Sequence, residues 1–565
     1  MNAAPAAPPA PAMGAAAELV GALMGHGVTD FVVSPGARSQ ALALTVAALA
    51  ESGDVTLHVR IDERVAGFVA LGLAIESGRP APLITTSGSA VANLLPAIVE
   101  AHHAGVPMIA LTADRPARLR GTGANQTTMQ PGMFSSFVGW ESDVAPPGEH
   151  TESYAAVAGT AFAAATVDIP GPVHLNVQFV EPLSSAADET VVALARATRE
   201  SVRAQFASNG DASTPAQSAH IELTPGPRTV VIAGADAGER AEAIAHDGGW
   251  PLIAEVTSGA RFGRNLVVHY RAALTTPELG DAIERVVVLG HPTLSRQVPA
   301  LLERPGLDVV RVDARTPVSV RATDAPASET LEWLRAWQRW DRAAQADHAQ
   351  RMAEVSPAAR APQIDVARSR TSADQREFLT AEVAASRARV TRELLVSAAW
   401  RATWPHDRLV FGASRLIRVA DAIVPGKKIP VHANRGLSGI DGNIATAIGI
   451  ALAAQPALTR LVLGDVATLY DAGALMFPTG EARPRVQVIV GNDGGGSIFD
   501  QLEVAATADQ SAFDRVMFTP QSVDFEQLAL AYGWRYVRVT TMGELETALI
   551  GAGNEPELIE VVLER

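Results

Sequence analysis

Polar residues suited to binding a metal ion follow two apolar runs in the last third of the chain. Arg460-Leu461-Val462-Leu463 leads into Gly464-Asp465, and the run from Val486 to Val490 leads into Gly491-Asn492-Asp493-Gly494. If both runs are neighbouring parallel strands, these groups share the carboxyl edge of one sheet. Mg²⁺ prefers carboxylate, amide and carbonyl oxygens, completed by phosphate oxygens, and glycine lets backbone N–H groups approach a diphosphate. The pattern agrees with a metal–diphosphate site, but Gly-Asp followed by Asn-Asp-Gly, taken alone, is more typical of an ordinary turn.

A carboxylate suited to a different chemistry lies near the start of the chain. Glu63 stands between His58-Val59-Arg60-Ile61 and the apolar stretch from Val65 to Gly72, which indicates a helix start. A Glu at the edge of an apolar pocket can hydrogen-bond a heterocycle nitrogen and shift its protonation. Because the helix dipole also favours acids in a first turn, a plain helix start is the alternative. A glycine turn, Thr86-Ser87-Gly88-Ser89, follows the next apolar run.

Short β-branched runs followed by helical patterns must position these residues. Such runs are typical of buried parallel strands with crossover helices. The predicted strands form three groups: 31–33, 82–85, 107–110 and 173–177; then 229–232, 252–254, 285–289 and 309–312; then 409–411, 429–431, 461–463, 486–490 and 558–562. The predicted fold class is therefore α/β, with three consecutive doubly wound parallel sheets and sites at the carboxyl ends of the strands.

The length of 565 residues agrees with three to four domains. We predict a disordered tail over 1–17, a first domain over 18–190, a linker over 191–227, a central domain over 228–355, a linker or helical connection over 356–395, and a third domain over 396–565. The two connections are predicted from a Pro- and Ala-bearing stretch and from a break at 356–362 in an otherwise helical pattern.

Composition excludes several classes of function. The chain has no Cys, so it has no disulfide, thiolate metal site, Fe–S cluster or Cys nucleophile. The net charge of −15 repels polyanions, and nucleic-acid binding is not expected. Only Lys427 and Lys428 are lysines, so a cationic site would be built from Arg guanidinium groups.

Targeting and nucleotide motifs are also missing. The first residues lack the basic region of a signal peptide, and the longest apolar stretches, 154–167 and 444–454, are too short to cross a bilayer. We expect a cytoplasmic protein without membrane insertion. No Gly-x-Gly-x-x-Gly follows a first strand, and P-loop, His-Glu-x-x-His and Gly-x-Ser-x-Gly patterns do not occur.

Taken together, the polar turns resemble those of the thiamine-diphosphate enzymes, in which pyrimidine-binding and diphosphate-binding domains flank a central domain. Within that superfamily the chain is most similar to the 2-succinyl-5-enolpyruvyl-6-hydroxy-3-cyclohexene-1-carboxylate synthases of menaquinone biosynthesis, which are transferases. The similarity covers nearly the whole chain after the tail. The matching runs are 34–39, 62–64, 86–93, 112–116, 123–126, 434–436 and 439–442.

The resemblance implies thiamine diphosphate and Mg²⁺ (or Mn²⁺) as cofactors. Glu63 matches the catalytic Glu that bonds the aminopyrimidine N1′ and so promotes loss of the thiazolium C2 proton, which makes that carbon the nucleophile. Asp465, Asn492 and the Gly494 carbonyl match the metal ligands. Ile440 matches the apolar residue that bends the cofactor. Further cofactor contacts are implied for Ser87, Gly88, Ser414 and Gly464.

The resemblance also implies two dianionic substrates. The keto carbon of 2-oxoglutarate is attacked, CO₂ leaves, and the resulting carbanion adds in 1,4 fashion to isochorismate. Carboxylates of this kind are held bidentately by Arg. The matching substrate positions are Arg38, Arg115, Asn125, Gln126, Arg418 and Arg435, with Ser414 as a polar partner and Arg296 as a further match in the second group of strands.

Two departures from the family pattern bear on these substrate contacts. Ala37 replaces the Ser usual before Arg38, which removes a hydroxyl group. Arg415 follows Ser414 where a neutral residue is usual, which adds a positive charge. Neither change alters the set of cofactor residues.

Assembly and alternative functions follow from the same resemblance. Because the catalytic Glu and the metal ligands lie on different subunits in this superfamily, a homodimer or homotetramer is expected. The alternatives are another thiamine-diphosphate 2-oxoacid decarboxylase or carboligase, and a catalytically silent regulatory relative. Retention of Glu63, Asp465 and Asn492 argues against the silent relative.

Overall fold

The computed structural model describes residues 10–149, 151–167, 169–185, 189–209, 220–224, 227–313, 316–320, 328–356 and 372–565. The chain divides into two compact units. Unit 1 comprises Met1–Thr214, Gly436–Pro456 and Tyr470–Pro484, and unit 2 comprises Pro215–Arg435, Ala457–Leu469 and Arg485–Arg565. Each unit is described by itself.

In the described part of unit 1, six parallel strands form one sheet in the order β2-β1-β3-β4-β6-β5. The chain leaves β1 toward one edge and returns to β3 on the other side, so the carboxyl ends of β1 and β3 form the switch point at which such sheets bind ligands. The strands are β1 (Asp30–Val33), β2 (Thr56–Val59), β3 (Leu83–Thr85), β4 (Met108–Asp114), β5 (Glu141–Val144) and β6 (Pro172–Gln178).

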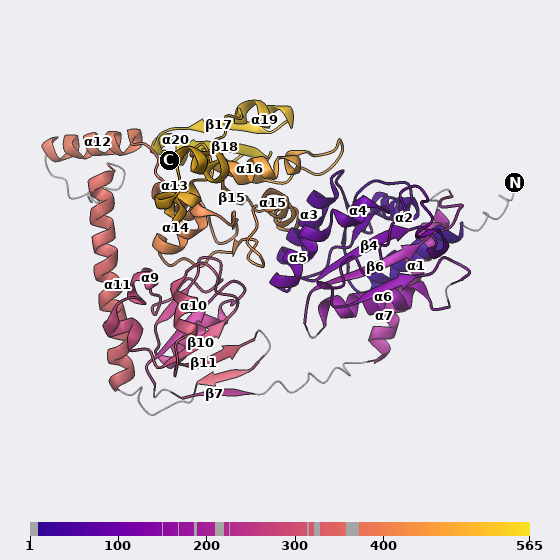
Figure 1. The fold of residues 1–565 in the computed structure, drawn as a ribbon, viewed down its shortest axis with the longest axis horizontal. Coiled ribbons are helices and arrows are strands. Elements are labelled where there is room, and N and C mark those ends of the chain that lie inside the picture. The colour runs from indigo at the N-terminus through magenta and orange to yellow at the C-terminus, as the bar shows by residue number, and fades with distance from the viewer. Residues whose placement is uncertain are drawn as a thin grey trace. The chain divides into compact units, whose positions relative to one another are not determined.

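Helices cover both faces of this sheet. One face packs against α1 (Pro11–Gly25), α2 (Gln40–Glu51), α6 (Tyr154–Thr166) and α7 (Glu189–Asn209), which share one hydrophobic core with the strands (Figure 1). The other helices of the unit are α3 (Glu63–Ser77), α4 (Ser89–Ala92), α5 (Leu95–Ala104) and α15 (Asn443–Ala453), joined by the short turns η1 (Ala117–Leu119) and η4 (Ala472–Leu475). A Cβ at Gly72 of α3 would lie 2.1 Å from the Thr446 carbonyl, so only glycine permits α3 and α15 to pack this closely.

Two predicted boundaries near unit 1 are wrong. The predicted disordered tail over 1–17 overlaps α1, which begins at Pro11, a residue suited to a first helical turn, and buries Ala12, Met13 and Ala16. The predicted linker over 191–227 contains most of α7, whose Ala195 and Val202 are buried against α1. The small apolar residues of α1 and α7 are buried although they do not form the β-branched runs from which the domains were predicted. Residues 1–9 and 210–219 of these segments lie outside the described residues.

The amino-terminal part of unit 2 has its own parallel sheet, described as four strands in the order β11-β10-β8-β9. Its strands are β8 (Thr229–Ala233), β9 (Leu252–Ala254), β10 (Arg285–Leu289) and β11 (Asp308–Val312), and a separate pair is formed by β7 (Ile221–Leu223) and β12 (Val318–Val320). The helices and helical turns are α8 (Arg240–Gly248), α9 (Tyr270–Ala273), η2 (Pro277–Asp281), α10 (Gln297–Leu302), α11 (Ser328–Val355) and α12 (Ser372–Arg387). Residues 357–371, which include most of the predicted break, lie outside the described residues.

The third sheet, also in unit 2, has six strands in its described residues, in the order β14-β13-β15-β16-β18-β17. They are β13 (Arg408–Phe411), β14 (Val431–His432), β15 (Thr459–Gly464), β16 (Val486–Asn492), β17 (Arg535–Val539) and β18 (Glu557–Val562). The helices and turns around it are α13 (Arg392–Ala402), α14 (Arg415–Ile423), α16 (Asp465–Tyr470), η5 (Ser497–Gln501), α17 (Val504–Thr507), α18 (Gln510–Phe513), η6 (Asp514–Phe518), α19 (Phe525–Ala531) and α20 (Met542–Ile550).

Every pairing between the named strands is parallel, so the prediction of three consecutive parallel α/β sheets is confirmed. Among the described residues, none of the helices combines the length and the apolar character that crossing a membrane requires.

Candidate functional site

The carboxyl edge of the third sheet gathers predicted site residues from four neighbouring strands. Arg435 follows β14, and Ser414 and Arg418 follow β13. Gly464 ends β15 and Asp465 comes directly after it, and Asn492 ends β16 with Gly494 just beyond. The adjacent positions Gly464 and Gly491 are paired in register, which brings the β15 and β16 turns side by side. The sheet order therefore places candidate substrate residues next to candidate metal ligands.

Asp465 has the properties of a metal ligand. Its side chain is buried, and its Oδ2 atom has no hydrogen-bond partner among the described residues. Burial, followed by the nearby Asp493 carboxylate, raises the pKa of Asp465 to about 7 against the backbone N–H groups that lower it, among them that of Gly494. A buried carboxylate oxygen without a partner is costly, and a cation is the group that best offsets this cost.

Asn492 and Gly494 complete the candidate ligand set. Asn492 Oδ1 accepts the Gly494 N–H at 3.1 Å, and the Gly494 carbonyl accepts the Gln521 N–H at 2.9 Å, which uses one of its two lone pairs. A Cβ added at Gly464 or Gly494 would meet no atom within 4 Å, so both positions border open space. One carboxylate, one amide and one carbonyl fit a divalent ion that takes its other ligands from phosphate and water.

The candidate ligand set contains a single carboxylate, that of Asp465. Among the described residues, no group of three or more His, Asp or Glu side chains is arranged to hold a metal ion. The described part of the chain therefore contains no metal site built from several carboxylates.

Arg415, the arginine that departs from the family pattern, lies beside the loop that carries Asn492 and Gly494. Arg415 Nη1 donates to the Ser497 carbonyl at 3.1 Å, and Arg392 Nη2 bonds the Asp493 carboxylate at 2.6 Å. The Ser497 hydroxyl also donates to Asp493. Burial and the neighbouring Arg392 lower the pKa of Arg415. Asp493 is thus used to neutralise arginines, and the positive charge of Arg415 borders the metal-binding edge.

The candidate substrate arginines of unit 2 have different surroundings. Arg418 Nη1 donates to the Ser414 carbonyl at 2.7 Å, and burial together with Arg271 lowers its pKa. Arg435 is 4% exposed and bonds Thr293. Arg296 lies on the surface, where its Nη1 is 3.4 Å from Glu503 Oε1. Arg418 and Arg435 therefore line the carboxyl edge, whereas Arg296 is exposed at the end of a central-domain loop.

In unit 1, three consecutive charged residues at the start of α3 have three separate roles. Asp62 caps the helix by accepting the N–H groups of Arg64 and Val65. Glu63 Oε2 accepts from Asn93 Nδ2 at 3.1 Å. Arg64 Nη2 is 3.5 Å from Asp471 Oδ1. Because the cap is supplied by Asp62 and the ion pair by Arg64, Glu63 is not required for either, which favours the functional interpretation of Glu63 over a plain helix start.

The predicted loops of unit 1 meet around Ser87. Arg115 Nη1 donates to Ser87 Oγ and to the Gln126 carbonyl, both at 2.8 Å. Gln126 Nε2 returns a bond to the Ser87 carbonyl at 2.9 Å. A Cβ at Gly88 would lie 2.9 Å from Gln126 Cγ, so glycine permits the close approach. The turn after β3 and the loop after β4 are therefore tied together.

Two further candidates flank this cluster. Arg38 donates from its backbone to Thr86 Oγ1 at 3.2 Å, and burial together with the nearby Arg115 guanidinium lowers its pKa. Asn125 accepts through its carbonyl from Thr127 at 3.2 Å. The two guanidinium groups are thus close enough for their charges to interact, and a carboxylate bound between them would offset that repulsion.

Ile440 lies in a loop that packs on α3. A Cβ at Gly442 would lie 2.0 Å from the Phe68 ring, and Asn443 Nδ2 donates to the Ile440 carbonyl at 2.7 Å. Ile440 itself is partly exposed. Unit 1 thus holds the Ile440 loop against the helix that begins with Glu63.

Several supporting residues were missed in the sequence. Glu560, Glu255 and Asp421 are buried carboxylates, and Asp471 fixes the start of α15 by accepting the N–H groups of Ile444 and Ala445. Glu560 interrupts an apolar strand, and Asp421 shares the buried face of α14 with Leu416 and Ile417. An acid at an otherwise apolar core position is the signal that identifies such residues.

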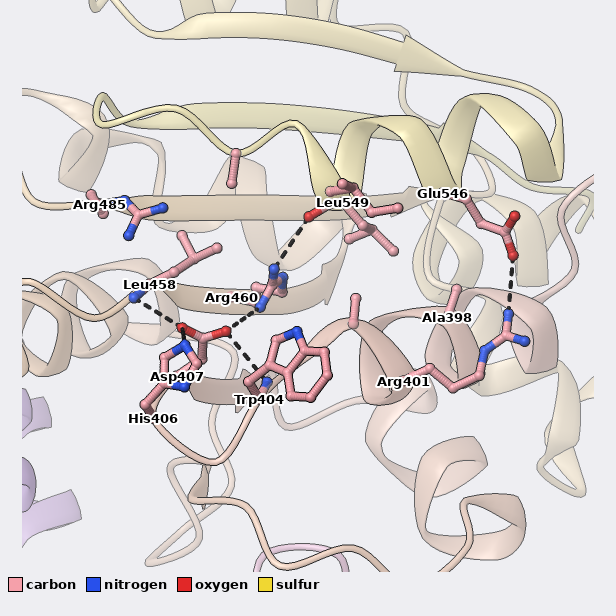
Figure 2. Close-up of a pocket in the computed structure, with 13 residues that line it drawn as sticks. Ala398, Arg401, Trp404, His406, Asp407, Leu458, Arg460, Arg485, Glu546 and Leu549 are labelled. Atoms are coloured by element: carbon pink, nitrogen blue, oxygen red, sulfur yellow. Dashed lines mark hydrogen bonds and ion pairs between the residues drawn. The ribbon is translucent and has the colours of Figure 1, made fainter.

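The opposite, amino-terminal edge of the third sheet contains a separate cavity of about 480 Å³ (Figure 2). Arg460 and Asp407 form a buried ion pair there at 3.1 Å, and Arg460 also bonds the Leu549 carbonyl at 3.2 Å. Arg401 pairs with Glu546 across the rim at 3.2 Å. None of the predicted site residues lines this cavity. Its charged groups are largely used in holding α13, α20 and the strand starts together.

Comparison with known proteins agrees with this geometry. The N-terminal thiamine pyrophosphate-binding domain of thiamine pyrophosphate enzymes matches residues 13–133, and the C-terminal thiamine pyrophosphate-binding domain matches residues 424–561. The thiamine diphosphate-dependent 4-hydroxybenzoylformate decarboxylase of Rhodococcus jostii aligns over 98% of this chain and 99% of its own, with a TM-score of 0.65 and 16% sequence identity. At this identity the likeness concerns the fold.

Closer relatives share a single name. A 2-succinyl-5-enolpyruvyl-6-hydroxy-3-cyclohexene-1-carboxylate synthase from Leifsonia xyli subsp. xyli is 50% identical, over 98% of this chain and 97% of the relative. One from Clavibacter michiganensis subsp. michiganensis is 51% identical over 96% and 95%, and one from a Nocardioides species is 40% identical over 100% and 97%.

Proposed function

The chain belongs to the 2-succinyl-5-enolpyruvyl-6-hydroxy-3-cyclohexene-1-carboxylate synthase family of thiamine-diphosphate enzymes, and on this premise we propose how its residues carry out the family's reaction. The substrates are 2-oxoglutarate, which loses CO₂, and isochorismate, which receives the remaining four-carbon unit by 1,4-addition. The reaction is a step of menaquinone biosynthesis.

The observation that carries the proposal is the Oδ2 atom of buried Asp465, which has no partner among the described residues, next to an oriented Asn492 amide and glycines that border open space. These groups would hold Mg²⁺ or Mn²⁺ and, through it, the diphosphate of the cofactor. When bound, thiamine diphosphate supplies the nucleophilic carbon and accepts the electrons that decarboxylation releases.

Glu63 would act on the other end of the cofactor. Its carboxyl group would hold a proton for exchange with the aminopyrimidine nitrogen, and the bound cofactor would supply the group that removes the reactive proton. Asn93 fixes one carboxylate oxygen by donating at 3.1 Å, and Asp62 fixes the start of the helix. Ile440 would provide the apolar surface against which the cofactor bends.

Arginines would bind the dianionic substrates. Arg38 and Arg115 supply two guanidinium groups in unit 1, where Gln126 and Asn125 add polar partners. Arg418 and Arg435 supply two more at the edge of the third sheet, with Ser414 beside Arg418. Planar guanidinium groups bind carboxylates bidentately, which fixes orientation as well as charge.

We expect a homodimer or homotetramer in the cytoplasm. The family's catalytic Glu and metal ligands come from different subunits, so two chains are needed for a complete site. Light scattering of the purified enzyme should give at least twice the mass of 59.1 kDa. A fully active monomer would contradict this expectation.

Substrate choice in the decarboxylation step tests the proposal. The full-length enzyme with thiamine diphosphate and Mg²⁺ should release CO₂ from 2-oxoglutarate in the presence of isochorismate, and not from pyruvate. Release from pyruvate alone would identify a different 2-oxoacid decarboxylase or carboligase. No release from either acid would identify a catalytically silent relative.

A further inference from the structure

Thr293, a residue of the central domain, accepts three hydrogen bonds from Arg435, one of the candidate substrate arginines. Arg435 donates from Nε and Nη2 to Thr293 Oγ1 at 3.0 and 2.7 Å, and from Nη2 to the Thr293 carbonyl at 3.1 Å. The two donor atoms, Nε and Nη2, lie on one edge of the guanidinium plane, and Nη1 takes no part in this contact. Three bonds to one residue set the direction in which the plane points.

The loop that carries Thr293 is itself fixed by a buried carboxylate. Glu255 follows β9, is 0% exposed and accepts the Thr293 N–H at 3.0 Å and the Leu294 N–H at 2.7 Å, one on each oxygen. In the next peptide group, Arg271 Nη2 donates to the Leu294 carbonyl at 3.2 Å. The backbone around Thr293 is therefore held by Glu255 and Arg271 and cannot easily follow Arg435 if that side chain moves.

The contact between the central sheet and α14 does not depend on Thr293. Asp421 of α14 is fully buried, accepts the Val256 N–H at 2.9 Å and accepts the Tyr270 hydroxyl at 2.6 Å. Arg261 adds bonds to the Val424 carbonyl at 2.8 Å and the Ala254 carbonyl at 2.7 Å. With this network in place, a change at Thr293 acts on Arg435 and leaves the packing of the two parts intact.

We propose that Thr293, held in place by Glu255, is a positioning residue that fixes the Arg435 guanidinium in the orientation that binds a substrate carboxylate. The inference rests on the proposed function, because it assumes that Arg435 is a substrate-binding residue. The central domain then contributes to substrate binding through an arginine of the third domain, in addition to any direct contact by Arg296 on the same loop.

Substrate affinity, more than turnover, should depend on Thr293. The carboxylates that remain in the product keep their charge throughout the reaction, so loss of a bond from Arg435 to one of them weakens ground state and transition state alike. Thr293→Val keeps the β-branched shape, removes the Oγ1 acceptor of two bonds and leaves the carbonyl contact. Thr293→Ser keeps the acceptor.

The test is steady-state kinetics of the full-length enzyme with thiamine diphosphate and Mg²⁺, in which 2-oxoglutarate and isochorismate are varied in turn. In Thr293→Val, KM for one of the two substrates should rise about tenfold while kcat stays within about twofold, as expected for loss of uniform binding. Thr293→Ser should restore KM. If the valine variant does not fold, Thr293→Ala is measured against the same serine variant.

Thr257→Val is the matched control, since it makes the same change in the same domain. Thr257 is buried, and its hydroxyl has no hydrogen-bond partner among the described residues; its replacement should leave both KM values unchanged. Unaltered KM values in Thr293→Val, or a loss confined to kcat, would overturn the positioning role. An inactive wild-type enzyme would instead reject the proposed function, so the two failures are distinguishable.

Discussion

Asn492 donates from Nδ2 to Glu560 Oε1 at 2.6 Å, and this bond orients the amide so that its Oδ1 atom is the one that meets the Gly494 N–H. Glu560 is itself held by the Tyr536 hydroxyl, which donates to its other oxygen. An amide turned by 180° would present hydrogen atoms to a cation. Glu560 therefore determines that the candidate site presents an oxygen.

Removal of Glu560 should weaken metal binding. In Glu560→Ala the Asn492 amide can rotate, and the Kd for Mn²⁺ in the presence of thiamine diphosphate should rise about 10- to 100-fold. Mn²⁺ titration followed by electron paramagnetic resonance measures this. Glu560→Gln, whose amide oxygen can still accept from Asn492, is the control and should bind within a few-fold of wild type. Equal affinity in wild type and Glu560→Ala would show that Asn492 is not a ligand.

Glu63→Gln should abolish turnover and leave cofactor binding largely intact. The glutamine keeps the size and one acceptor oxygen but cannot share a carboxyl proton with the pyrimidine, so we expect kcat to fall about 100-fold or more. Rates are compared with cofactor affinity from fluorescence titration. Glu76→Gln makes the same change in the last turn of the same helix and should retain wild-type rates. Undiminished turnover in Glu63→Gln would mean that another carboxylate exchanges the proton with the pyrimidine.

Arg115→Lys tests whether a guanidinium is needed in unit 1. Lysine keeps the charge but cannot bond Ser87 Oγ and the Gln126 carbonyl while presenting a planar fork to substrate. KM for a dianionic substrate should rise about tenfold or more. Arg118→Lys, at an exposed position three residues later, is the control. If both lysine variants have wild-type KM, Arg115 is not a substrate residue.

Asp471 should make the stability of the protein depend on pH. Its buried carboxylate Oδ2 accepts the N–H groups of Ile444 at 2.8 Å and Ala445 at 3.0 Å. Burial nevertheless raises the pKa of Asp471 from 3.8 to about 6. The folded state thus binds this proton more tightly than the unfolded chain. The resulting stabilisation is complete below pH 3.8 and is lost as pH rises through about 6.

Asp471→Asn should remove this dependence, because an amide oxygen can accept the same two N–H groups without ionising. Between pH 5 and pH 7 the free energy of unfolding of wild type should fall by about 1 kcal/mol relative to the variant. Urea unfolding at several pH values measures the difference. Asp54→Asn is the control: its pKa is lowered by Arg196 and Arg199, so its effect on stability should stay constant over this range. Parallel curves for wild type and Asp471→Asn would contradict the assignment.

Sequence patterns predicted the interior strands of the three described sheets and missed three of the edge strands. The interior strands β4, β6, β8, β15 and β16 are buried along nearly their whole length, and all but β6, which alternates apolar residues with His174 and Asn176, contain a continuous apolar run. The strands β2, β5 and β17 were missed because each lies at a sheet edge and leaves some of its side chains partly exposed. Such strands lack the apolar run on which the prediction depends.

The candidate site was predictable where function requires a particular residue type next to a glycine turn, as at Asp465, Asn492 and Ser87. It was not predictable where a residue acts through another. Thr293, Glu255 and Glu560 lie far in sequence from the groups that they hold, and only the sheet order brings them together. The exposed position of Arg296 likewise depends on how its loop leaves β10, which no local pattern specifies.

The identity of the product is the most direct test of the proposed function. The full-length enzyme is incubated with thiamine diphosphate, Mg²⁺, 2-oxoglutarate and isochorismate, and the mixture is analysed by mass spectrometry. We predict a product with the mass of isochorismate plus the four-carbon unit left after 2-oxoglutarate loses CO₂, formed only when both substrates are present. Loss of CO₂ without this adduct, or an adduct formed equally well from pyruvate, would contradict the proposed function.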